Sequence, residues 1–246
     1  MLHTNLVVMK KMTLTLIVVA SLLGWSCESS KILNATFEGD PVNGLPAKNL
    51  PGDPTGDAIN YHNAIQPRLK VQNSTISGNK ALHFIFNPIT DPPNLSDLWL
   101  GFKGIDADLT QTIWFTHTGK NNGARILIDV SDGHTTLIAR MRISANGDVG
   151  LAQNLQDVDY TNIIGNVGSG VHTVVFTVTT SNLKYNVTIF PESGTTITAE
   201  NKPMITDNLL YFHNPANPTL SFKYQDPTAP GAYYAIGSVS ISRKKP

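Results

Sequence analysis

The chain has few of the residues that mark cross-linked or catalytic proteins. It contains one cysteine, Cys27, which excludes an intramolecular disulfide and a cysteine-based metal site. It has only four glutamates, at positions 28, 38, 192 and 200, and none lies within a few residues of another on an expected strand. Because glycosidases use a close pair of carboxylates, the sequence does not indicate such an enzyme.

Long apolar runs are also lacking, apart from one near the N-terminus. Residues 13–23 (TLTLIVVASLL) are mostly apolar, but they fall short of the ~20 residues that a membrane-spanning helix needs. A basic stretch at 9–12 (MKKM) precedes this run, and Gly-Trp-Ser at 24–26 follows it, directly before Cys27. This order predicts a secretory signal peptide.

The cysteine after that peptide resembles the lipobox of secreted lipoproteins, in the loose form of Bacteroidetes-type bacteria. The resemblance implies cleavage before Cys27, acylation of its thiol, and attachment to the outer membrane through the acyl chains. Glu28 resembles the acidic signal for display on the cell surface. We therefore expect a signal peptide over 1–26, a lipidated cysteine and tether over 27–30, and one domain over 31–246.

Charge of either sign is scarce and balanced. Removing residues 1–26 leaves 16 basic and 18 acidic side chains. A protein that binds nucleic acid needs a basic surface, so nucleic acid is not an expected partner.

From Lys31 onward the sequence shows short alternating runs, rich in β-branched residues, that end at Gly, Asn, Asp or Pro. This pattern predicts an all-β, antiparallel sandwich or barrel. The expected strands are 31–37, 67–72, 80–86, 97–102, 111–117, 124–130, 136–143, 147–152, 171–178, 184–190, 209–213, 219–224 and 233–242. The proline-rich segments 40–57 and 87–97 are expected to be loops, since proline donates no ladder hydrogen bond.

The clearest expected hairpin joins 124–130 to 136–143 through a tight turn at 131–133. Its predicted register places Ile128 opposite Leu137 and Ile126 opposite Ala139, on one face. The other face would carry Leu127, Ile138 and three arginines, with Arg125 opposite Arg140.

Three segments together resemble the back half of a concanavalin A-like or laminin-G-like jelly roll. They are ARILIDVSDGHTTLIARMRISANGDVGL, SGVHTVVFTVTTSNLKYNVTIFPESG and the closing YYAIGSVSISRK, within residues 110–246. The resemblance implies a two-sheet antiparallel β-sandwich of the jelly-roll type in a single domain, whose last strand returns to pair near the first. A galactose-binding-like sandwich is the structural alternative.

Two groups of residues are candidates for ligand binding. Arginines on a sheet face can hold hydroxyls or a carboxylate, and loop-edge aromatic rings can stack on sugars. The candidates are Arg125, Arg140 and Arg142, together with Trp99, Tyr233 and Tyr234. They favour a non-catalytic glycan-binding module, with a polysaccharide as the expected partner.

Other functions stay open. A structural or adhesion lipoprotein needs none of these residues. A polysaccharide lyase would use His172 or Tyr185 as a base near the arginines, and a glycosidase is the remaining enzyme class. No cofactor is expected, except that jelly rolls of this type can hold one structural Ca²⁺. Oxygen-rich segments supply its candidate ligands, Glu38, Asp40, Asp106 and Asp108.

Overall fold

A computed structural model gives the fold of the chain. It describes residues 31–47, 59–61, 68–74, 80–85, 97–101, 109–117, 125–131, 137–154, 162–168, 170–179, 182–205, 219–225 and 233–243. All the elements in these ranges are strands. No helix within them has the length and apolar character needed to cross a membrane. The expected signal peptide, Cys27 and the tether lie outside the described residues.

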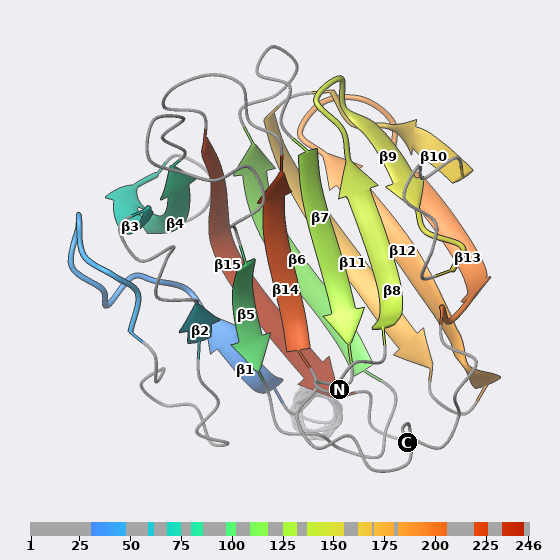
Figure 1. The fold of residues 1–246 in the computed structure, drawn as a ribbon, viewed down its shortest axis with the longest axis horizontal. Coiled ribbons are helices and arrows are strands. Elements are labelled where there is room, and N and C mark those ends of the chain that lie inside the picture. The colour runs from blue at the N-terminus through green and yellow to red at the C-terminus, as the bar shows by residue number, and fades with distance from the viewer. Residues whose placement is uncertain are drawn as a thin grey trace, which may run out of the picture.

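The strands form two antiparallel sheets that lie against each other, one of seven strands and one of eight (Figure 1). The seven-stranded sheet has the order β10-β9-β8-β7-β14-β5-β2. Its strands are β2 (Ile59–Tyr61), β5 (Asp97–Gly101), β7 (Arg125–Ser131), β8 (Leu137–Ile143), β9 (Asp148–Leu151), β10 (Asn162–Asn166) and β14 (Thr219–Gln225).

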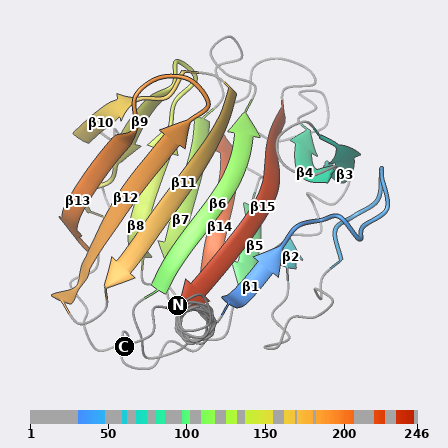
Figure 2. The same ribbon diagram turned by 180° about the vertical axis from the view of Figure 1, so that it is seen from behind.

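The eight-stranded sheet is seen from its outer side in Figure 2. Its order is β13-β12-β11-β6-β15-β4-β3, and β1 pairs with β15 beside this path. Its strands are β1 (Lys31–Ala35), β3 (Leu69–Asn73), β4 (Lys80–Ile85), β6 (Leu109–His117), β11 (Gly170–Thr179), β12 (Lys184–Pro191), β13 (Ile197–Pro203) and β15 (Tyr233–Arg243). The pairing of β1 with β15 confirms that the last strand returns to the first.

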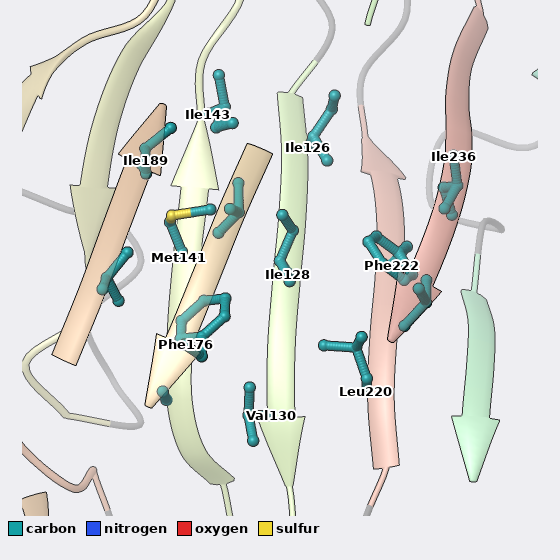
Figure 3. Close-up of a cluster of buried hydrophobic side chains, with 14 of the residues drawn as sticks. Ile126, Ile128, Val130, Met141, Ile143, Phe176, Ile189, Leu220, Phe222 and Ile236 are labelled. Carbon is teal, nitrogen blue, oxygen red and sulfur yellow. The ribbon is translucent and has the colours of Figure 1, made fainter. Parts of the chain in front are cut away.

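The core fills the space between the sheets. Alternate residues of each strand point inward, as period-two patterning requires. Ile128 and Phe222 come from the seven-stranded sheet and Phe176 from the other, and all three are fully buried (Figure 3). Both sheets thus contribute to one layer of buried side chains. This arrangement is the all-β sandwich predicted from the sequence.

Most of the expected strands are present, with ends that differ by a few residues. The expected strand at 209–213 lies outside the described residues. Three observed strands were missed: β2, β10 and β13. β10 (NIIGN) contains a glycine at 165, where an added Cβ would lie 2.8 Å from Ile197 of β13. The glycine therefore lets the edge strands of the two sheets approach.

The predicted register of the β7–β8 hairpin is wrong by four residues. Ile128 lies opposite Met141 rather than Leu137, and Ile126 lies opposite Ile143 rather than Ala139. The connection is longer than the predicted tight turn, since β7 ends at Ser131 and β8 begins at Leu137. A shift by an even number keeps each side chain on its face, so most face assignments survive.

Two face assignments fail because of a bulge. The register shifts between Val130 and Ser131, so that Ser131 lies opposite Leu137. Ile138 belongs to the core cluster instead of the outer face, and Leu137 belongs to a separate cluster with Leu127. An extra residue in one strand reverses the alternation beyond it, which the sequence pattern alone does not reveal.

His172 of β11 is a polar residue in the core, 1% exposed. Burial lowers the pKa of its imidazole to about 4, from an ordinary value of 6.5. Between these values the unfolded chain binds a proton that the folded protein does not take up. The folded state is therefore fully favoured above pH 6.5 and loses stability as the pH falls toward 4.

We predict that the free energy of unfolding of wild type decreases, relative to a His172→Gln variant, by about 2–3 kcal/mol between pH 7 and pH 4. Glutamine does not titrate, so the difference between the two proteins isolates the histidine. Urea unfolding at several pH values measures it. A difference that stays constant with pH would contradict the prediction.

Candidate functional site

The outer face of the seven-stranded sheet carries a charged cluster at its centre. Asp129 lies between the core residues Ile128 and Val130, so alternation turns its side chain to the outer face. Arg140 is its direct cross-strand neighbour on β8, and Lys223 lies on β14, at the other side of β7. We call Asp129, Arg140 and Lys223 the Asp129 cluster.

Arg140 holds the carboxylate of Asp129 with two parallel hydrogen bonds. Its Nε donates to Oδ1 at 2.7 Å and its Nη2 donates to Oδ2 at 2.7 Å. Lys223 Nζ lies 3.9 Å from Oδ2. The Asp129 side chain is only 6% exposed, whereas those of Arg140 and Lys223 are 24% and 29% exposed. The carboxylate is thus fixed and shielded, and both cations reach the surface.

Apolar side chains lie beside this cluster on the same sheet. Leu127, Leu137, Ala152 and Ile205 form a small buried group that is separate from the main core. Ile205 follows β13 of the other sheet, and its backbone N–H donates to the carbonyl of Ile138 at 3.0 Å. The chain after β13 therefore crosses to β8 and covers part of this sheet.

The remaining sequence candidates on this sheet are less closely associated with the cluster. Arg125 is exposed and pairs with Gln225, so its predicted position opposite Arg140 is wrong. Arg142 is half-buried and lies opposite Leu127. Trp99 pairs with Ser221, which pairs with Asp129, so its backbone belongs to the same row of the ladder. Its side chain is outside the described part of the structure.

The two tyrosine candidates lie elsewhere. Tyr233 is 37% exposed on the outer side of the eight-stranded sheet, and it stacks on His83 with ring centroids 5.0 Å apart. Tyr234 is 1% exposed and stacks on Phe84 in the core. Its assignment as a ligand residue is wrong, because neighbouring strand residues point to opposite faces. The two sheets thus separate Tyr233 from the arginines.

The two described calcium candidates do not fit a divalent cation. Lys80 Nζ donates to the carbonyls of Glu38 and Asp40, at 3.0 and 2.5 Å. The Asp40 carboxylate accepts from the backbone N–H of Ala47. An ammonium group thus occupies the oxygen-rich turn and would repel Ca²⁺. Asp106 and Asp108 lie outside the described residues, where calcium binding stays a prediction.

The two residues named as bases for a lyase lie away from the arginines. His172 and Tyr185 are 1% and 2% exposed and belong to the inward side of their sheet, so neither can act as a base at the arginines. Burial also raises the pKa of Tyr185 to about 12. No group of three metal-ligating His, Cys, Asp or Glu side chains occurs in the described ranges.

Sequence reasoning recognised Arg140 but missed Lys223 as a member of the cluster. Lys223 and Asp129 are 94 positions apart in the sequence. They come together through the pairing of β14 with β7, which the sequence did not reveal. A pattern of alternation identifies outward positions, but it does not identify which strands are neighbours.

We predict that Arg140→Gln lowers the free energy of unfolding by about 1–3 kcal/mol, because it leaves a shielded carboxylate without its hydrogen-bond partner. The double variant Asp129→Asn with Arg140→Gln removes that charge and should be more stable than the single variant. Urea unfolding of the three proteins measures both effects. The prediction fails if the double variant is the less stable of the two.

No protein-family model matches this chain, and no curated protein sequence matches it. Solved structures do. The seed lectin of Lotus tetragonolobus matches 87% of this chain and 100% of its own, with a TM-score of 0.50 and 9% identity. The lectin UEA-II, complexed with galactose, matches 89% of this chain and 100% of its own, with a TM-score of 0.46 and 11% identity.

A sialidase also matches, over 83% of this chain and 19% of its own, with a TM-score of 0.46 and 12% identity. At such identities the similarity concerns the fold. The alignment with the Lotus lectin shows that this chain folds as a lectin-type β-sandwich.

Proposed function

We propose that this chain is a lipid-anchored envelope protein whose sandwich binds a glycan without cleaving it, at the Asp129 cluster. The observation that carries the proposal is the fixed carboxylate at the centre of an outer sheet face, with an arginine and a lysine beside it. The lectin-type fold supports the same conclusion.

The chemistry of the cluster suits sugar hydroxyls. A sugar hydroxyl accepts from cationic donors, so the surface-reaching ends of Arg140 and Lys223 can hold two neighbouring hydroxyls at once. The bidentate pair with Asp129 keeps the guanidinium of Arg140 in place before the ligand arrives, which reduces the entropy lost on binding. The nearby apolar residues provide the mostly apolar setting typical of small-ligand sites.

We predict that the mature protein binds a glycan on an array, and that Lys223→Met weakens this binding. The expected loss is on the order of 1–3 kcal/mol, the contribution of a charged hydrogen-bond partner. The double variant Asp129→Asn with Arg140→Gln should lose at least as much. Isothermal titration calorimetry with a glycan that binds on the array measures the loss of affinity for each variant.

Lys70→Met is the matched control, because Lys70 lies on β3 of the other sheet. Equal losses for Lys70→Met and Lys223→Met would place the site away from the Asp129 cluster. No binding to any glycan of a broad array would favour a structural lipoprotein. Release of sugar products from the hit would contradict the non-catalytic assignment.

The anchor is tested separately. We predict that Cys27→Ala releases the protein from the membrane fraction or traps it as precursor, because the acyl chains supply the membrane affinity. Cell fractionation and labelling with a radioactive fatty acid check this. Wild-type protein that takes up no label, or a variant that stays fully with the outer membrane, would refute the lipoprotein assignment.

A further inference from the structure

The outer side of the eight-stranded sheet has a composition unlike that of the Asp129 cluster. One row of neighbouring residues crosses the sheet from β1 to β13, and five of its six members carry a hydroxyl or an amide. The row is Asn34, Ser240, Thr112, Val175, Thr188 and Thr198. Because neighbouring strands lie about 4.8 Å apart, the row extends for roughly 24 Å across its six strands.

Parallel rows on either side repeat this composition. One contains Ser242, Thr110, Thr177 and Asn186, and the other contains Ser238, Trp114, Thr173 and Phe190. We call these three rows the hydroxyl face. Lys31 of β1 pairs with Ser242 at the end of one row, and none of the other residues named in the rows carries a charge. Lys184, at the start of β12, is the one charged residue among the described outward positions of β11, β12 and β15.

Exposed aromatic rings lie at two places on this side of the sheet. Phe190 is 48% exposed on β12, and Tyr233 is 37% exposed on β15. Tyr233 is held by its stack on His83, at an interplanar angle of 9°. Burial lowers the pKa of His83, so its imidazole adds no charge at neutral pH. Trp114 belongs to β6, where it pairs with Thr173 of β11 and Ser238 of β15. In the strand order β6 lies between β12, which carries Phe190, and β15, which carries Tyr233.

We infer that the hydroxyl face binds an extended, uncharged polysaccharide, as a second surface on the side of the sandwich opposite the Asp129 cluster. The inference rests on the proposed function, that the domain binds glycans, and adds the ligand class and the surface. Threonine and serine hydroxyls donate to and accept from sugar hydroxyls, and the aromatic rings stack on the C–H faces of the sugars.

The charge and polarity of the face select this partner over others. An acidic polymer would need several cations, and among the residues of the three rows Lys31, at the edge of one row, is the one cation. A second protein copy would favour a patch with an apolar centre, because the cores of homodimer interfaces are enriched in apolar area. Here the central row has one apolar side chain, Val175. A long, uncharged polysaccharide, which is rich in hydroxyl groups, is the partner that matches this face.

The experiment uses the mature lipoprotein in detergent with insoluble, uncharged polysaccharides: cellulose, β-1,3-glucan and starch. Polygalacturonate and alginate gels serve as acidic comparators. Thr188→Arg places a bulky charge in the middle of the face. Thr195→Arg makes the same change in the exposed turn between β12 and β13, and is the matched control. Phe190→Ala removes an exposed ring and tests the face with little risk to folding.

We predict that wild type binds at least one uncharged polymer in a pull-down and that Thr188→Arg and Phe190→Ala each weaken this binding at least tenfold. Thr195→Arg should bind as wild type does. Circular dichroism confirms that each variant is folded. The Asp129→Asn, Arg140→Gln double variant is run in parallel, so that the two surfaces are tested separately.

Three results would overturn the inference. In the first, the Asp129→Asn, Arg140→Gln variant loses binding while Thr188→Arg and Phe190→Ala bind as wild type does. This result would refute binding at the hydroxyl face and would leave the proposed function intact. A wild-type protein that binds no glycan on any support would remove both. If sedimentation shows a dimer that Thr188→Arg converts to a monomer, with polymer binding unchanged, the face belongs to a second copy.

Discussion

The last strand of the chain holds the larger sheet together. β6 pairs along one side of β15, from Tyr234 to Arg243, while β4 and β1 share the other side in succession. A bulge between Ile236 and Ser238 separates the two halves. Since the chain has one cysteine and no disulfide, this ladder and the core beneath it order the first strand. The aromatic stacks of Tyr233 and Tyr234 also depend on the pairing of β15 with β4.

Strand alternation then gives the sandwich two outer faces that are chemically different. On β7 the inward residues form the core, and Asp129 is left on the outer side with Arg140 and Lys223. On β11 and β12 the same alternation leaves mainly threonine, valine and asparagine outside, with Phe190 and one charged residue, Lys184. One sandwich can therefore present a charged cluster on one side and a face of mostly uncharged side chains on the other without either disturbing the shared core.

The sequence predicted the class of fold and the side of most strand residues, because a period of two is visible in a single strand. It did not predict register, since a hairpin shifted by four residues keeps every side chain on its face. Nor did it reveal the bulge at Val130 and Ser131, where one extra residue exchanged the faces of Leu137 and Ile138. β13 (ITAENKP) was missed because its outward residues are polar and its pairing with β12, rather than its own pattern, makes it a strand.

The candidate site was harder to predict than the fold, because it depends on contacts between distant strands. The sequence marked Arg140 as an outward residue, but its two hydrogen bonds to Asp129 follow from the observed register. Such a shielded ion pair contributes little net stability, because desolvating both charges offsets most of their attraction. A pair of apolar residues at 129 and 140 could serve the fold as well. The pair therefore fixes the position of Arg140 on the outer face more than it adds to the stability of the sandwich.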